Sequence, residues 1–95
     1  MAIAVYFHPK SMTLAQFEEV HRRLDELGQA TNPHRLHHSC FGVDGELMVY
    51  DIWDSPESFE AFGQVLMPIL ADVGVAPGDP AVMPVQLIRQ FAEGV

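Results

Sequence analysis

The chain has little cysteine, few basic residues and no long hydrophobic run. Cys40 is its single cysteine, so an intrachain disulfide is excluded. Five Lys and Arg face 13 Asp and Glu, a net charge of −8, so the clustered cations that bind phosphate backbones are missing. No apolar stretch approaches the ~20 residues of a membrane span, and no charged leader precedes an apolar run. We therefore expect a cytoplasmic protein with no nucleic-acid or membrane partner.

The composition indicates one small folded domain, residues 1–95. The hydrophobic fraction of 48% is too high for a disordered chain. A domain of 95 residues buries a smaller share of its surface than a larger one does. Association with a second chain is a common way to gain stability at this size.

The first half of the chain predicts a strand followed by a helix. Residues 2–7 are a continuous apolar run of strand length with β-branched and aromatic side chains. Thr13 and Gln16 form a capping-box pattern that starts a helix over 13–28, which Gly28 ends. Within it we expect two i,i+4 ion pairs, Glu18 with Arg22 and Glu19 with Arg23.

Two strands follow, over 35–43 and 46–53, joined by a hairpin turn at Asp44-Gly45. Ser55 as N-cap and Pro56 as first helical residue then predict a second helix, which Gly74 ends. Pro68 is expected to kink that helix or to restart it as a second segment. Residues 83–91 are interpreted as the last strand.

The element order β-α-β-β-α-β predicts an α+β, ferredoxin-like fold. Right-handed crossovers give a four-stranded antiparallel sheet with both helices on one face. An open second face should alternate apolar with polar residues, yet both faces of the first and third strands are largely apolar. In the third strand the residues of one face are Leu47, Val49, Asp51 and Trp53, and those of the other are Met48, Tyr50 and Ile52. A large exposed apolar patch usually marks an interface. We therefore expect a homodimer whose open sheet faces meet and enclose a cavity.

The segment 49–62, Val-Tyr-Asp-Ile-Trp-Asp-Ser-Pro-Glu-Ser-Phe-Glu-Ala-Phe, resembles the dimeric α+β barrel superfamily. The resemblance rests on the strand that ends in Trp53-Asp54-Ser55 and on the helix with spaced phenylalanines after it. Arg35-Leu36-His37-His38 and Leu66-Met67-Pro68-Ile69-Leu70 are also similar to this group.

The superfamily includes antibiotic-biosynthesis monooxygenase-like proteins, haem-degrading oxygenases, isomerases and stress-responsive barrels. The resemblance implies the fold and the homodimer, and it allows cofactor-independent oxygenase- or isomerase-like chemistry. The monooxygenase-like branch often has a histidine in the second helix, where this chain has Phe62-Gly63-Gln64. That departure counts against monooxygenase or haem chemistry.

Three histidines, His34, His37 and His38, have a spacing that suggests a metal site. If His37 and His38 lie in one strand, however, they point to opposite faces and cannot bind the same ion. No cysteine or carboxylate nearby completes a known motif. We therefore predict no metal and no cofactor.

Five residues are candidates for chemistry or ligand binding. His38 shares a strand parity with Leu36 and Cys40 and could act as a general acid or base, and His8 is a second catalytic candidate. Tyr6, Tyr50 and Trp53 are candidates for ligand binding, the tyrosines by lining a cavity for an apolar or aromatic molecule. The tyrosines serve a dimer interface equally well, and Trp53 also suits packing against the second helix.

Asp51 interrupts the apolar third strand and needs a charged partner or water. Arg35 and Arg89 are the two candidates, and a structural ion pair is favoured over catalysis. Cys40 has no basic neighbour in sequence, so we expect a buried, inert thiol.

The leading hypothesis is a homodimeric barrel that binds a small apolar or aromatic molecule and performs cofactor-independent monooxygenase- or isomerase-like chemistry. The alternative is a non-enzymatic dimer that acts as a binding or structural module.

Overall fold

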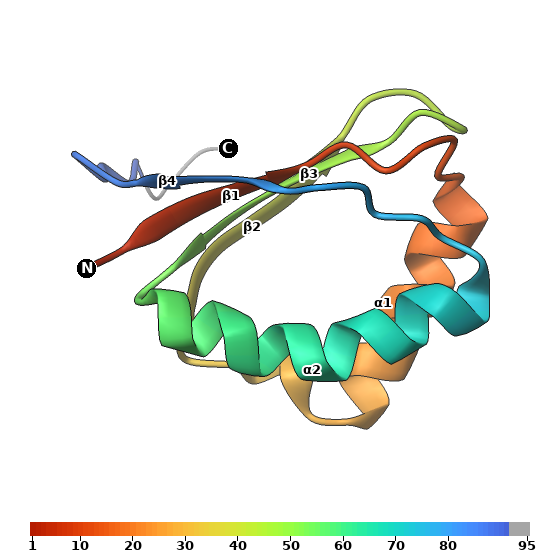
Figure 1. Cartoon of the computed structure of the whole chain (residues 1–95), viewed down its shortest axis with the longest axis horizontal. Coiled ribbons are helices and arrows are strands. Elements are labelled where there is room, and N and C mark those ends of the chain that lie inside the picture. The colour runs from red at the N-terminus through yellow and green to blue at the C-terminus, as the bar shows by residue number, and fades with distance from the viewer. Residues whose placement is uncertain (92–95) are drawn as a thin grey trace.

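A computed structural model describes residues 1–91 of the chain. Four strands form one antiparallel sheet in the order β2-β3-β1-β4, and both long helices cover the same face of it (Figure 1). The elements are β1 (Ile3–Phe7), α1 (Leu14–Glu26), the 3-10 helix η1 (Gln29–Thr31), β2 (Arg35–Phe41), β3 (Met48–Trp53), α2 (Pro56–Val73) and β4 (Ala81–Pro84). The predicted ferredoxin-like arrangement is confirmed. None of the described helices has the length and apolarity needed to cross a membrane.

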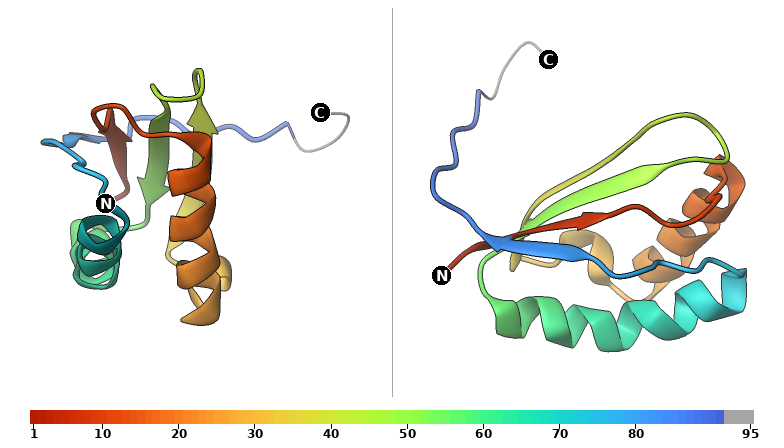
Figure 2. Two further views of the ribbon diagram at one scale, coloured as in Figure 1. Left: turned by 90° about the vertical axis from the view of Figure 1, so that its right-hand side faces the viewer. Right: turned by 45° about the horizontal axis from the view of Figure 1, so that its top comes forward.

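The core lies between the sheet and the helices. Ile3, Val5 and Phe7 of β1 are buried on the helix side, where Trp53 of β3 is fully buried as well. The alternate residues of β1 are only half-buried because no described element covers the other face (Figure 2). The sheet therefore has a helix-covered face and an open face.

Helix α1 begins with the predicted capping box. The Thr13 hydroxyl accepts from the Gln16 amide at 3.1 Å, and the Gln16 side chain accepts from the Thr13 amide at 3.0 Å. A second acceptor comes from the β2–β3 connection, because the Asp44 carboxylate accepts from the Leu14 amide at 2.9 Å. The hairpin is thereby tied to the start of α1. Gly28, with φ of 78°, follows the end of the helix as expected.

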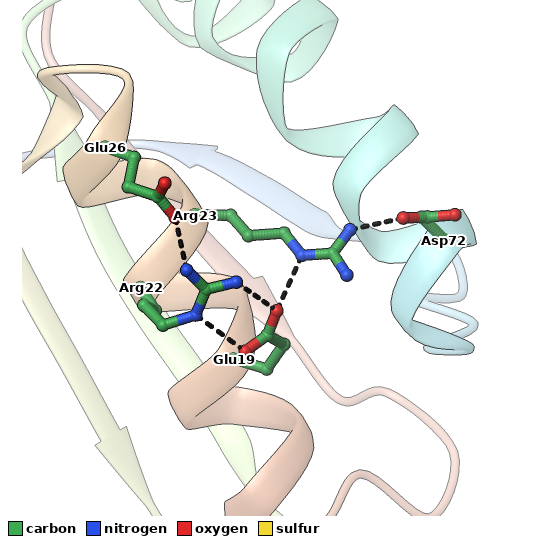
Figure 3. Close-up of polar contacts among 5 residues, drawn as sticks. All are labelled: Glu19, Arg22, Arg23, Glu26 and Asp72. Atoms are coloured by element: carbon green, nitrogen blue, oxygen red, sulfur yellow. Dashed lines mark hydrogen bonds and ion pairs between the residues drawn. The ribbon is translucent and has the colours of Figure 1, made fainter.

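The exposed side of α1 carries a linked set of ion pairs (Figure 3). Glu19 accepts from Arg22 at 2.7 Å and from Arg23 at 2.8 Å, so the predicted Glu19–Arg23 pair is present. Arg22 pairs with Glu19 and Glu26 instead of the predicted Glu18. Arg23 also reaches Asp72 near the end of α2 and links the two helices.

The β2–β3 hairpin is shorter than predicted and contains a bulge. The turn at Asp44-Gly45 is present, with the Glu46 amide donating to the Val43 carbonyl at 2.8 Å. The strands themselves cover 35–41 and 48–53. The register shifts between Arg35, which lies opposite Trp53, and His37, which lies opposite Ile52. Leu36 is the extra residue and is 41% exposed.

Helix α2 starts at the predicted Ser55 cap, whose hydroxyl accepts from the Ser58 amide at 3.1 Å. It continues through Pro68 to Val73, so of the two outcomes expected at Pro68 the restart as a second segment does not occur. Proline removes one helical hydrogen bond. Here Ile69 and Leu70, directly after it, are buried in the core and hold the helix in place. Gly74, with φ of 87°, ends it as predicted.

The last strand is displaced from its predicted position. β4 covers Ala81–Pro84 rather than 83–91, and it pairs antiparallel with β1. The Val85 amide makes one further bond, to the Ala2 carbonyl at 3.0 Å. Because β1 begins at Ile3, later residues have no neighbouring strand to pair with. The segment 85–91 instead turns away from the sheet (Figure 2).

Candidate functional site

A small cavity of about 50 Å³ lies between the sheet and the two helices. Its walls are mostly apolar, with Phe17, Val20 and Phe62 among them, and four polar side chains also line it: His21, Arg35, His38 and Asp51. We call this space the inner cavity. Charged groups in so apolar a setting require partners, and these four supply them to one another.

Asp51 and His38 form the centre of the site. They lie directly opposite each other on β3 and β2, and Asp51 is only 2% exposed. Nδ1 of His38 lies 2.6 Å from Oδ1 of Asp51. A carboxylate at Nδ1 fixes the orientation of an imidazole and favours the tautomer whose proton is on Nδ1. Nε2 of His38 is then the proton-accepting nitrogen.

His21 of α1 completes a chain of hydrogen bonds. Its Nε2 lies 2.8 Å from Nε2 of His38, and its Nδ1 lies 3.3 Å from the Phe17 carbonyl oxygen one turn earlier. The two imidazole planes are inclined by 23° with ring centres 4.9 Å apart, so the nitrogens meet edge to edge. Burial lowers the pKa of His21, and neighbouring His38 lowers it further, against a smaller opposite effect of the Phe17 carbonyl. A neutral His21 is therefore favoured.

Arg35 is the cation of the site. Its Nε lies 3.7 Å from Oδ2 of Asp51, which is an ion pair but too long for a hydrogen bond. The guanidinium packs over the Phe62 ring at 4.5 Å and lies 5.3 Å from the centre of the Trp53 ring. Burial lowers its pKa, and Asp51 opposes that effect. Among the described residues its buried Nε has no hydrogen-bond partner, so a donor is free.

A second, larger depression adjoins the inner cavity. It has a volume of about 340 Å³ and is lined by polar residues at the end of α1 and along η1, including Asp25, Gln29 and Asn32. We call it the outer groove. His21, Leu24, Arg35 and His38 line both spaces. The two histidines therefore stand at the boundary between the inner cavity and the outer groove.

The sequence-predicted site residues fall on two faces. His38 lies on the helix-covered face, in the inner cavity. Tyr6 and Tyr50 lie opposite each other in the β1–β3 register, on the open face, and His8 is exposed beside Tyr6 with ring centres 6.4 Å apart. His38 and these three side chains thus do not converge within one chain.

Trp53 and Cys40 are packed on the helix side. The Trp53 ring is fully buried against Phe59 and Phe62 of α2, with ring centres 6.1 Å and 4.8 Å away. Packing against the second helix, one of the two roles expected of Trp53, is thus observed. Cys40 is half-buried against the core, and burial raises the pKa of its thiol.

The three clustered histidines are separated. His34 pairs with Asp54 at 2.7 Å, His37 lies on the open face near Tyr50, and His38 points inward. The opposite orientation of His37 and His38 is as predicted. Within residues 1–91, no group of three or more His, Cys, Asp or Glu side chains is arranged to hold a metal ion.

Two features of the site escape the sequence pattern. Strand parity pairs His38 with Leu36, but the bulge at Leu36 puts Arg35 on His38's face instead. Of the two proposed partners of Asp51, Arg35 is the one in contact. His21 is not singled out either, although it follows Phe17 by four residues and precedes Leu24 by three, on the apolar stripe of α1. A histidine on such a stripe is the signal that could have found it.

Comparison with known proteins shows likeness in structure alone. No family model and no curated protein sequence matches the chain. A crystal structure described as a "putative Antibiotic biosynthesis monooxygenase" from Chloroflexus aurantiacus J-10-fl matches with a TM-score of 0.67 and 16% identity, covering 97% of this chain and 100% of that one. One with the same description from Deinococcus radiodurans has a TM-score of 0.53 and 13% identity, covering 99% of each chain.

A third match is SnoaB from Streptomyces nogalater, described as a cofactor-independent oxygenase. Its TM-score is 0.59 at 16% identity, and the match covers 97% of this chain and 96% of that one. Identities this low establish shared architecture rather than shared chemistry. The chain has the ferredoxin-like fold of antibiotic biosynthesis monooxygenase-like structures, which agrees with the resemblance seen in its sequence.

Proposed function

We propose that this protein is a cofactor-independent enzyme that removes a proton from a small apolar hydroxyaromatic or enolisable molecule. The observation that carries the proposal is the 2.6 Å contact between His38 and Asp51 at the wall of an apolar cavity. An imidazole held by a buried carboxylate is a common arrangement for a general base. A base of this kind can take the proton of a phenol or of a carbon next to a carbonyl.

Three of the four polar side chains have distinct roles in that step. Nε2 of His38 accepts the proton, and Asp51 stabilises the resulting imidazolium through Nδ1. The positively charged guanidinium of Arg35, a side chain that lines both spaces, stabilises the oxyanion left on the substrate. Once the proton has moved, Arg35 and the imidazolium outweigh Asp51 by one positive charge, which matches the single negative charge of the substrate.

The anion has two chemically balanced fates without a cofactor. Reprotonation at another atom by the same imidazolium is an isomerisation. Alternatively, a phenolate can react with O2. One oxygen atom is added to the ring and gives a quinone. The other oxygen atom leaves as water, which takes up the hydrogen of the substrate hydroxyl and the hydrogen of the oxidised ring carbon. The second fate is the kind of reaction named in the description of SnoaB, a cofactor-independent oxygenase of similar fold.

The proposal is tested with a panel of hydroxynaphthalenes, anthrones and cyclic ketones in D2O. NMR follows deuterium incorporation, and an oxygen electrode follows O2 uptake. The His38→Gln variant is expected to lose about 100-fold or more in rate, the usual scale of a general base. His34→Gln is the matched control, since His34 lies outside both spaces. Equal rates in His38→Gln and wild type, or no reaction with any compound, would favour the non-enzymatic module.

We also propose that the protein is a homodimer joined through the open sheet face. Phe41 on β2 and Met83 on β4 are 46% and 55% exposed, and Tyr6 and Tyr50 lie on the same face of β1 and β3. Leu87 and Phe91, in the segment that leaves the sheet, are 70% and 81% exposed. Apolar surface of this extent favours association.

A further inference from the structure

The inner cavity is too small for the proposed substrates while His21 stays where it is. Small-molecule sites in proteins usually measure about 300–1,000 Å³, whereas the inner cavity holds about 50 Å³, enough for a few water molecules. The outer groove, at about 340 Å³, lies on the other side of the two histidines. The His21 ring is one of the side chains that line both spaces.

His21 also takes the hydrogen-bonding position at Nε2 of His38 that the proposed chemistry requires for the substrate. Nε2 of His38, the proton-accepting nitrogen, lies 2.8 Å from Nε2 of His21. That is the position a substrate hydroxyl must take to be deprotonated. In the observed arrangement His21 therefore keeps the inner cavity small and also makes Nε2 of His38 unavailable to a substrate.

The number of protons decides how firmly His21 is held. Three contacts link Phe17, His21, His38 and Asp51, and each needs one proton between its two atoms. A neutral imidazole carries one N–H and an ionised carboxylate none, so the neutral histidines supply two protons for three contacts. In one of the three contacts two lone pairs then face each other. A third proton, shared along this hydrogen-bonded chain, would make all three contacts hydrogen bonds.

We propose that His21 is a gate between the outer groove and the inner cavity. The gate is closed when the hydrogen-bonded chain from Phe17 to Asp51 holds one shared proton, and it is released when that proton leaves. The inference rests on the proposed function for its substrate. Deprotonation costs the closed state one hydrogen bond, about 1 kcal/mol, or a roughly five-fold change in the open population. The same deprotonation frees Nε2 of His38, so opening coincides with a competent base.

The charged groups around His21 are consistent with a single shared proton. His38 and Arg35 face it from β2, and Asp25 acts on it from its own helix. Asp51 of β3 reaches it through His38. Helix α2 contributes apolar side chains, Leu66 and Leu70, to the inner cavity. A second added proton would place two imidazolium rings 2.8 Å apart near Arg35, so the gate should open in acid as well.

Stopped-flow binding of 2-naphthol, read by its fluorescence, tests the gate without any chemistry. Wild type should associate most slowly in an intermediate pH range and faster on either side. His21→Ala should associate at least about fivefold faster at that pH and lose the pH dependence, since no fraction of the protein is closed. His34→Ala is the control and should behave as wild type. Equal association rates in His21→Ala and wild type, or no binding to His21→Ala, would overturn the proposal.

A second measurement needs no variant and no ligand. NMR of the ring nitrogens in wild type should give sharp His21 signals while the hydrogen-bonded chain holds its shared proton. Once that proton is lost, the His21 signals should be broadened by exchange. Unchanged ring dynamics across the titration would overturn the gate. The outcomes remain separable from catalysis: gated binding without turnover defeats the proposed function alone, and turnover with ungated binding defeats the gate alone.

Discussion

Arg35 and His38 are three positions apart on β2, yet their side chains lie on the same face of the sheet. In a regular strand an odd separation places side chains on opposite faces. The bulge at Leu36 absorbs one residue, so Arg35 lies opposite Trp53 while His38 lies opposite Asp51. Asp51 is thereby in contact with both, at 2.6 Å from His38 and 3.7 Å from Arg35. The bulge therefore brings a carboxylate, an imidazole and a guanidinium together on one wall of the inner cavity.

The Asp51–Arg35 pair should be strongly coupled. Asp51→Asn leaves the Arg35 guanidinium buried without its counter-charge and should cost roughly 3 kcal/mol of unfolding free energy. Adding Arg35→Met removes the stranded charge, so the double variant should be less destabilised than the sum of the two single variants. Urea denaturation of the four proteins measures this coupling. Simple additivity would show that the pair does not interact.

Glu19 should contribute to stability in a defined pH range. Its hydrogen bonds from Arg22 and Arg23 lower its pKa from 4.5 to about 2. A lowered carboxylate pKa stabilises the fold above the ordinary value, and that stability is lost as pH falls toward about 2. Glu19→Gln should therefore be less stable than wild type near neutral pH, with the difference vanishing near pH 2 and shrinking in high salt. A difference that persists in strong acid would contradict this assignment.

Charge on the open face should dissociate the proposed dimer. Met83→Glu places a carboxylate among the exposed apolar side chains of that face, away from the inner cavity. Sedimentation velocity should show wild type at twice the chain mass of 10.6 kDa and the variant shifted to monomer. The matched exposed change Leu27→Glu, at the end of α1, should leave the dimer intact. A clean wild-type monomer at micromolar concentration would refute the dimer.

Cys40 should react slowly in the folded protein. It is half-buried, and burial raises the pKa of its thiol, so little thiolate is present near neutral pH. Ellman's reagent at pH 8 should label the folded protein more slowly than the urea-unfolded chain. Equal rates would show that the thiol is freely accessible.

The sequence predicts local structure well where the signals are local. Thr13 with Gln16, Ser55 with Pro56, and Gly74 each mark a helix end through contacts within a few residues, and all are observed. The position of β4 depends instead on where β1 begins, which no pattern within 83–91 reveals. Apolar periodicity there fits several registers.

The candidate site is less predictable for a related reason. His21 and His38 are 17 positions apart, and they meet only because α1 packs across β2. The bulge that aligns Arg35 with His38 leaves no mark in the alternation of polar and apolar residues. His38 could be nominated by residue type, but its partners follow from tertiary packing.

The most direct test of the central claim is the protonation of the His38 ring in the ligand-free protein. Long-range nitrogen–proton NMR correlation on histidine-labelled protein assigns the proton of each ring nitrogen. At neutral pH we predict a proton on Nδ1 of His38, in a short hydrogen bond that disappears in Asp51→Asn. The chemical shift of Nε2 of His38 should change when His21 is replaced by Ala. A His38 ring that carries its proton on Nε2 alone, with Nδ1 unprotonated and indifferent to Asp51, would contradict the account.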